Sequence, residues 1–267
     1  MNRNIGMAMV VTATVAFGIA RADPTDDLSF RVVLYGWLPD VGGETTFPQN
    51  DGGEVSSDDS SILDSLSMAF MGSLAVERGR WGAFTDVIYL NFGNTKSRTR
   101  GLTVNDQPLP ISATAKAELD LTGWSWTVAG SYQLRDESNG GLQAFAGARL
   151  LDMTQTLDWK FSGDVASIPV GEREGHAEAS LSNVDFVAGA KGQFRFGADH
   201  QWFTPYYMDV GTGDSDLTWQ AMAGVGRSFH WGDVILAWRY LDYDLQSGND
   251  IQSVNFNGPA IAAAFRW

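Results

Sequence analysis

The amino-acid sequence predicts an all-β protein, an antiparallel transmembrane β-barrel, and three observations support that fold class. Apolar and polar residues alternate with a period of two in segment after segment of the chain. Tryptophan (10) and glycine (30) are abundant, and aromatic residues make up 12% of the chain. Beyond the N-terminal segment, no apolar run approaches the ~18 residues that a transmembrane helix needs. Lipid contacts only alternate residues of a barrel strand, which explains a near-neutral mean hydropathy of -0.14.

The alternation predicts ten strands. They are expected over 29–38, 67–78, 81–94, 118–134, 141–157, 180–196, 201–210, 217–230, 233–245 and 254–267. The connections after the first, third and fifth strands are long (39–66, 95–117 and 158–179), whereas those after the second, fourth, sixth and eighth are short turns. This is the layout of an outer-membrane barrel, with short periplasmic turns and long extracellular loops.

The segment 39–66 leaves the strand count open. Residues 40–47 and 53–56 are able to pair as an extra hairpin, which would give twelve strands in place of ten, and 60–66 is compatible with a short helix. Eight strands is the third alternative. The last strand ends on Trp267 and is expected to turn Ile261 and Phe265 toward lipid and to close the barrel against 29–38.

The first 22 residues are expected to be a signal peptide. A basic residue precedes an apolar stretch over 5–20, which ends in the A-x-A cleavage pattern Ala20-Arg21-Ala22. The stretch is short for a membrane anchor. We therefore expect an outer-membrane β-barrel domain over 23–267, located in the cell outer membrane, monomeric, with lipid and the barrel-assembly machinery (through the C-terminal strand) as its partners.

Charge and cysteine content exclude other classes. The chain has no cysteine, so no disulfide stabilises it. The net charge of -14 becomes -16 once Arg3 and Arg21 leave with the signal, which argues against nucleic-acid binding. The acidic runs lack the ligand spacing of a calcium loop, and no cofactor motif is present, so neither a metal nor a cofactor is expected.

Alternate residues of a strand point to opposite faces of the sheet. On each strand, the face that carries the charged residues is expected to point into the lumen. That inward set holds five bases and five acids: Arg31, Arg149, Lys191, Arg195 and Arg239 against Glu77, Asp86, Asp185, Asp209 and Asp233. Ten strands enclose a lumen only somewhat wider than one filled by side chains. The set is therefore interpreted as a paired network that plugs the lumen, with a narrow charge-selective pathway as the alternative.

Four tryptophans are expected at the membrane interface, since they lie in or beside short turns or end the chain: Trp81, Trp202, Trp231 and Trp267.

The chain resembles a group of uncharacterised proteobacterial outer-membrane β-barrel proteins. The segments that carry the resemblance are 35–39 (YGWLP), 62–66 (ILDSL), 71–72, 78–90 (which includes GRWG), 209–220 (DVGTGDSDLTWQ) and 239–244 (RYLDYD). Arg227 departs from the group, which tends to have an aromatic residue there. The resemblance implies the fold and the location, and it implies no activity.

Two function classes remain open. The protein is expected to be a barrel with a narrow, charge-lined and plugged lumen, at most a small passive channel for small solutes, or else a structural or surface-interaction barrel that acts through its extracellular loops. An enzyme is not expected. A ten-stranded barrel with a histidine and acids near its rim resembles the omptin proteases. An outer-membrane hydrolase is therefore kept as a distant alternative. However, a general base needs a positioned partner, which the solvated acidic segment around His176 does not promise.

Overall fold

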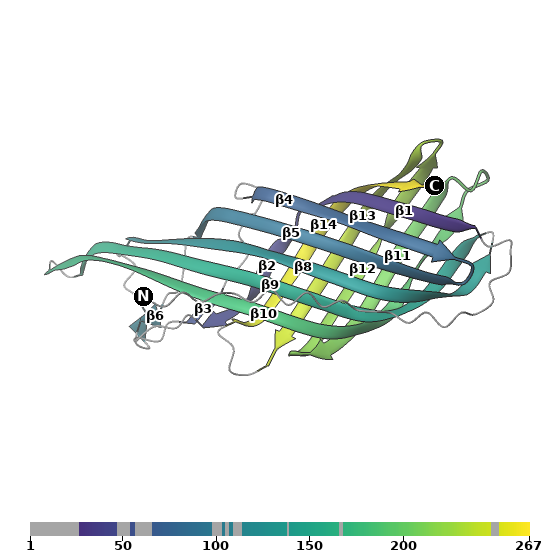
Figure 1. Cartoon of the computed structure of the whole chain (residues 1–267). Coiled ribbons are helices and arrows are strands. Elements are labelled where there is room, and N and C mark those ends of the chain that lie inside the picture. The colour runs from purple at the N-terminus through teal and green to yellow at the C-terminus, as the bar shows by residue number, and fades with distance from the viewer. Residues whose placement is uncertain are drawn as a thin grey trace, which may run out of the picture.

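The structure, a computed structural model, describes residues 27–46, 54–56, 66–97, 103–104, 107–108, 114–137, 139–165, 168–246 and 251–267. The wall is built from β1 (Leu28–Trp37), β4 (Leu66–Arg78), β5 (Trp81–Ser97), β8 (Thr114–Glu137), β9 (Gly140–Val165), β10 (Ile168–Phe196), β11 (Trp202–Gly213), β12 (Ser215–Phe229), β13 (Gly232–Leu245) and β14 (Ile251–Arg266). Each strand pairs antiparallel with the next, and β14 pairs with β1, so the sheet closes into a barrel of ten strands (Figure 1). The predicted fold class and strand count are confirmed.

The extra hairpin considered for 39–66 exists in part, but it adds no strand to the wall. β2 (Asp40–Thr46) pairs with β14 in the register that β1 already uses, because Trp37 lies opposite Ala260 and Asp40 opposite Asn257. β1 and β2 are thus one strand interrupted at Leu38 and Pro39, where proline has no N–H to donate to the ladder. β3 (Glu54–Ser56) pairs back on β2. The twelve-strand and eight-strand alternatives were wrong, and the helix considered for 60–66 falls almost wholly outside the described residues.

Three strands continue well beyond the barrel. β9 has 26 residues and β10 has 29, whereas a membrane-spanning strand needs about 9–11. Within the described chain, β10 pairs with β11 only over 185–196, Val184 still hydrogen-bonds to Asp214, and residues 168–182 pair with β9 alone. In Figure 1, β8, β9 and β10 project together past the other strands. The loop expected over 158–179 is therefore wrong: apart from 166–167, which are not described, it is strand.

The loop expected over 95–117 is also partly strand. β5 continues to Ser97 and β8 begins at Thr114. Between them, β6 (Thr103–Val104) and β7 (Gln107–Pro108) pair with each other. The segment 95–117 is rich in polar and charged residues, so it lacks the clear apolar–polar alternation by which the other strands were predicted.

The turn rim, the end of the barrel that carries the short connections, is set by local backbone chemistry. Gly79 turns β4 into β5 with φ 59°, and Gly197 leaves β10 with φ 85°, both in the left-handed region that favours glycine. The opposite end, with the longer connections, is the loop rim. Because ten antiparallel strands alternate in direction, β1 starts and β14 ends at the turn rim.

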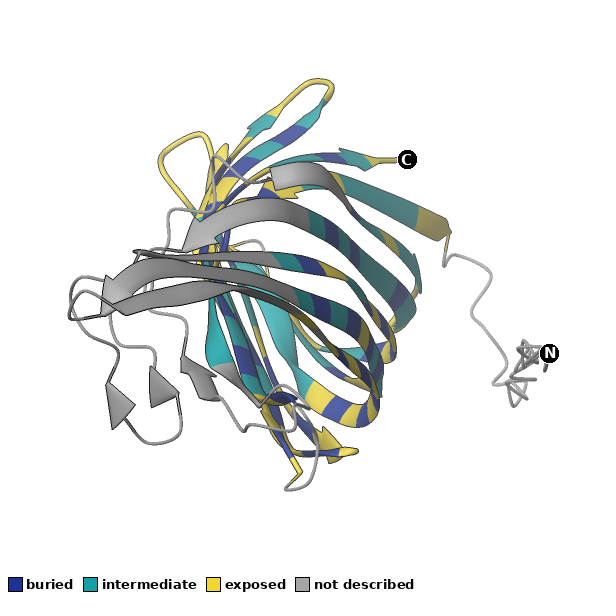
Figure 2. Cartoon of the chain, turned by 90° about the vertical axis from the view of Figure 1, so that its left-hand side faces the viewer, coloured by how far each residue is buried: buried dark blue, intermediate teal, exposed yellow. Residues whose placement is uncertain are grey.

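The two faces of the wall differ as the parity predicts. Buried and exposed residues alternate along the strands (Figure 2). The outward parity exposes large apolar side chains, among them Leu34, Leu74, Val128, Val184, Phe186, Phe194, Met208, Val210, Leu236, Trp238 and Ile261. A polypeptide cannot expose so continuous an apolar belt to water at low cost, so lipid is its natural solvent. In the described part of the chain, no helix is long and apolar enough to cross a membrane.

The half of the lumen nearest the loop rim is filled by apolar side chains. Its members come from eight of the ten wall strands: Trp37, Met71, Ile88, Leu90, Leu121, Leu151, Met153, Ala179, Leu181, Leu241, Tyr243, Leu245, Ile251, Val254, Phe256 and Ala260. We call this set the apolar plug. Trp37, which is 1% exposed, packs against Phe256 with the two rings tilted by 52°, and its indole N–H donates to the carbonyl of Gly258 (3.1 Å).

Candidate functional site: the ion-pair layer and the cavity of the lumen

A layer of charged side chains crosses the lumen beside the apolar plug. Arg239 on β13 donates from Nη2 to Asp86 Oδ2 on β5 (3.0 Å) and to Gln220 Oε1 on β12 (2.9 Å). Its Nη1 donates to the Tyr35 hydroxyl of β1 (2.8 Å), which itself donates to Asp86 Oδ1 (2.8 Å). The guanidinium also lies 5.0 Å from the ring centre of Trp37. One arginine thus ties four strands together across the barrel.

A second arginine closes the other side of this layer. Arg149 on β9 is 1% exposed and forms an ion pair with Asp209 on β11. Its Nε donates to Thr127 of β8 (3.2 Å) and its Nη1 to Thr218 of β12 (3.3 Å). A buried charge is tolerated only when it is paired and hydrogen-bonded, and Arg149 meets both conditions.

Two of the predicted acids find neutral partners. Asp185 is fully buried; it accepts from the backbone N–H of Ser215 (2.9 Å), from the Ser215 hydroxyl (2.8 Å) and from Asn183 Nδ2 (2.7 Å). Glu77 Oε1 accepts from Gln143 Nε2 (2.7 Å). Both side chains lie in the lumen, as their positions along the strands predict. Neutral hydrogen-bond donors, not the predicted ion pairs with a base, satisfy their carboxylates.

The remaining predicted charges lie toward the turn rim. Asp233 accepts from Arg266, forming an ion pair, and from the Ser228 hydroxyl (2.7 Å), while Arg31 Nη2 lies 3.8 Å from it. Arg195 donates to the carbonyl of His200 (3.1 Å) and contacts the Phe203 ring. Lys191 Nζ lies 3.7 Å from the ring centre of Phe84.

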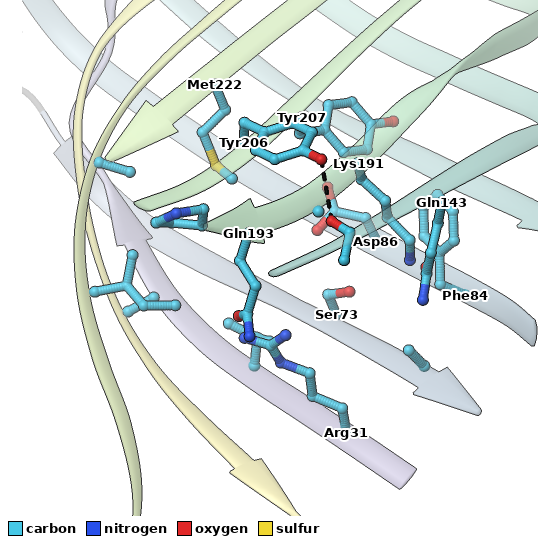
Figure 3. A pocket seen from close by; sticks show the side chains of 18 of the residues that line it. Arg31, Ser73, Phe84, Asp86, Gln143, Lys191, Gln193, Tyr206, Tyr207 and Met222 are labelled. Carbon is cyan, nitrogen blue, oxygen red and sulfur yellow. Dashed lines mark hydrogen bonds between the residues drawn. The ribbon is translucent and has the colours of Figure 1, made fainter. Parts of the chain in front are cut away.

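A cavity of about 560 Å³ occupies the turn-side half of the lumen. It extends from Glu137 and Gly140 at the turn rim to Asp86 and Arg239 in the ion-pair layer. Figure 3 shows Arg31, Lys191, Gln143 and Gln193 pointing into it. The lumen therefore has three successive contents: an open cavity, a charged layer and the apolar plug.

Sequence reasoning missed several members of this site. Arg266 lies on the same parity as Ala262 and Ala264, opposite to the lipid-facing Phe265, so its inward direction was readable from the alternation. Tyr35, Gln143 and Gln220 were missed because a search for charge does not find neutral hydrogen-bonding partners.

The four predicted interfacial tryptophans are exposed on the outer surface. Trp81 and Trp267 are each 66% exposed; Trp81 packs edge-on against Tyr132 and Trp267 stacks on Phe30. Trp231 stacks on Phe229. Arg227, the charge on an outward position, lies over Trp202 (5.4 Å) and Phe229 (5.3 Å) at the turn rim.

The histidines lie apart from the lumen site. His176 is exposed on the extension of β10, in register with Asp158 of β9. His200 and His230 lie in turns at the turn rim, and His200 has φ 51°. Among the described residues, no three His, Asp or Glu side chains are grouped so that they could hold a metal ion.

The fold and the site together define a class. The protein is an all-β, closed ten-stranded antiparallel barrel, with an apolar outer belt and a lumen that holds both an ion-pair layer and an apolar plug, and it resembles outer-membrane barrels.

The comparisons with known proteins do not assign the chain to a narrower class. No protein-family model matches the chain, and no curated protein matches its sequence. Similar solved structures include the outer-membrane protease OmpT from Escherichia coli, with 10% identity over 91% of this chain and 96% of that one and a TM-score of 0.48. The translocator domain of the autotransporter NalP from Neisseria meningitidis has 13% identity over 91% and 90%, with a TM-score of 0.40. At these values the two structures carry no information about activity.

Proposed function

We propose that the protein is an integral outer-membrane barrel with an occluded lumen, exported by a cleaved signal peptide, and at most a small passive channel for small solutes. The observation that carries the proposal is the sequence of two barriers in the lumen. A solute that enters from the turn rim meets the Arg239–Asp86–Tyr35 group and then the apolar plug around Trp37. Hydrophobic constrictions exclude ions because they do not replace the hydration shell.

Single-channel recording in planar lipid bilayers tests the proposal. We expect small conductance steps or none from the purified full-length protein, because a ten-stranded barrel with a filled lumen has no continuous water column. Large porin-like steps would contradict an occluded lumen.

Substitution of Asp86 or Arg239 separates a plug from a channel. If the pair is a structural plug, Asp86→Asn and Arg239→Gln lower thermal stability and leave permeability unchanged. If it lines a conducting path, the same variants change conductance or ion selectivity. Arg80→Gln is the matched control: Arg80 lies in the β4–β5 turn outside the cavity, where its exposed contact with Tyr132 should affect neither quantity.

A second function, interaction at the cell surface, is supported by the strands that extend past the barrel. Residues 168–182 of β10 pair with β9 on one side and, within the described chain, with no strand on the other, whereas Val184 hydrogen-bonds to Asp214 through both its N–H and its carbonyl. An unpaired strand edge is a template for strand addition by another chain. The exposed Glu178 on this stretch is the kind of edge charge that limits unspecific pairing.

Removal of the extension tests this second function. Thr156 and Glu178 lie opposite each other in the β9–β10 ladder, so 157–177 can be replaced by an Asn-Gly turn without changing the register. We expect unchanged barrel stability and conductance, but a loss of adhesion between cells that display the protein. Equal adhesion by both chains would exclude a role for the extension in adhesion.

No catalytic role is proposed for His176. His176→Ala should leave any hydrolytic activity of the purified protein unchanged, and loss of turnover in that variant would revive the hydrolase alternative.

A further inference from the structure

The turn-side cavity contains two cationic groups whose hydrogen-bonding capacity the protein does not use. Among the described side chains, Lys191 makes no hydrogen bond or ion pair, and its ammonium rests on the face of Phe84. Arg31 Nε is buried and has no acceptor. The nearest carboxylate to Arg31 is Asp233 at 3.8 Å, which is already engaged by Arg266 and Ser228. Among the described side chains, the buried Arg31 Nε is a donor without an acceptor, which is costly. The Arg31 side chain as a whole, which is 34% exposed, and the Lys191 ammonium line the cavity, where they can receive an anion.

The positive charges around the cavity also repel one another. The guanidinium of Arg31 experiences repulsion from Arg266 and Arg195, and Arg31 in turn repels the ammonium of Lys191. An anion placed among like charges at low dielectric gains from each of them. Asp86 also acts electrostatically on Lys191, but its carboxylate is engaged by Arg239 in the ion-pair layer.

Three carboxylates besides Asp86 line the cavity and oppose an anion: Glu77, Asp136 and Glu137, the last in an ion pair with Arg135. Glu77 lines the same cavity and contributes a negative charge near Lys191 and Arg31. Its Oε1 is held by Gln143 Nε2 rather than by either cation. Glu77 therefore lowers the affinity of the cavity for anions without filling the position between the two cations.

The wall beside the cations is aromatic and apolar. Phe84 and Tyr207 line the cavity with their ring centres 6.4 Å apart and their planes nearly perpendicular, and Met222 and Ile235 continue the apolar surface. The volume of about 560 Å³ falls in the ~300–1,000 Å³ range typical of small-molecule sites. Phe84 and Tyr207 are held by Phe145, which packs against both (5.2 and 5.0 Å).

We propose that this cavity is a binding site for a small aromatic monocarboxylate that enters from the turn rim. The carboxylate lies between Lys191 Nζ and the Arg31 guanidinium, and the ring packs on Phe84 and Tyr207. The occupant does not cross the barrel, because the ion-pair layer and the apolar plug close the far side of the cavity. The site goes beyond the occluded-barrel proposal and does not depend on it.

A ¹⁹F NMR titration of the full-length protein in lipid nanodiscs tests the site, with 4-(trifluoromethyl)benzoate as the probe. We expect saturable binding of the benzoate and none of 4-(trifluoromethyl)benzylamine, which has the same ring and the opposite charge. Equal binding of the two probes would indicate partition into lipid and would overturn the proposal, as would a benzoate that never saturates.

Three substitutions test the proposal, because two of them should weaken benzoate binding and the third should strengthen it. Lys191→Gln and Arg31→Gln should each weaken benzoate binding by about tenfold or more, since each removes a charge-assisted contact. Glu77→Gln should strengthen it, because one opposing carboxylate is lost. The matched control is Arg80→Gln: Arg80 lies in the β4–β5 turn and contacts Tyr132 outside the cavity, so binding should not change.

Folding of each variant is verified by heat-modifiable migration in SDS gels. Unchanged affinity in folded Lys191→Gln, or weaker binding in folded Glu77→Gln, would exclude the site. Conductance is measured separately, so large conductance steps together with normal benzoate binding would overturn the occluded lumen alone.

Discussion

Arg239 on β13 and Asp86 on β5 meet across the lumen, with Nη2 and Oδ2 3.0 Å apart, although 153 residues separate them in the chain. Their contact is partly buried on the Asp86 side and almost fully buried on the Arg239 side, with side chains 17% and 7% exposed. The pair is both the charged barrier of the lumen and a brace between opposite walls of the barrel.

Removal of one partner of this pair should be more harmful than removal of both. Asp86→Ala leaves a buried guanidinium without its counter-charge, which we expect to cost about 3–5 kcal/mol. The double variant Asp86→Ala, Arg239→Ala should lose less than the sum of the single variants. Urea unfolding in lipid vesicles, followed by tryptophan fluorescence, measures these free energies; strictly additive losses would show that the two side chains are not coupled.

The apolar plug depends on Trp37, which is 1% exposed. Trp37→Ala should lower the free energy of unfolding by about 3–5 kcal/mol through the cavity it leaves. Trp37→Phe retains most of the volume and loses the hydrogen bond to Gly258, so it should cost less, about 1–3 kcal/mol. The same unfolding assay applies, and an equal loss in both variants would assign the effect to the hydrogen bond rather than to packing.

Gly226 lies beneath the ring of Phe203, and a Cβ there would approach the ring to 2.3 Å. Phe203 is fully buried and has little room to move, so Gly226→Ala should destabilise the barrel by about 1–3 kcal/mol. At Gly36, no heavy atom lies within 4 Å of the position that a Cβ would take, which makes Gly36→Ala the matched control with little effect. Thermal unfolding of the two variants side by side provides the comparison.

The depth of the lipid-facing belt can be probed with arginine. Met208 lies midway along β11, and Phe196 lies at the turn rim opposite Trp202; the two side chains are 60% and 46% exposed on the outward face. Met208→Arg should cost about 2–4 kcal/mol and Phe196→Arg only about 0–1, since the penalty falls toward the interface. Measurement requires reversible unfolding from bilayers. Equal costs at both positions would mean that Met208 does not face hydrocarbon.

The alternation of the sequence was sufficient for much of this architecture. A strand's side-chain period is a local property, so 81–94 could be assigned a lipid face with Val87 and a lumen face with Asp86 without knowledge of any partner strand. The glycine turns at 79 and 197 likewise follow from their own backbone needs. Local chemistry also placed Arg266 inward, although it was not recognised as a member of the charged set.

Only the tertiary structure decided which charges meet. Parity states that Arg149, Asp185 and Asp209 face the lumen, but the choice of Asp209 as the ion-pair partner depends on how ten tilted strands are staggered when the barrel closes. The same closure made β2 a continuation of β1 and, among the described residues, left β10 without a second neighbouring strand over 168–182. The sequence alone thus determined the faces and the turn positions and favoured ten strands, because these follow from period and backbone preference within each segment; the pairing of β2 with β14 excluded twelve. The strand register decided where the cavity, the ion-pair layer and the apolar plug lie in the lumen. Register is a tertiary property, because it aligns strands that are far apart in the sequence.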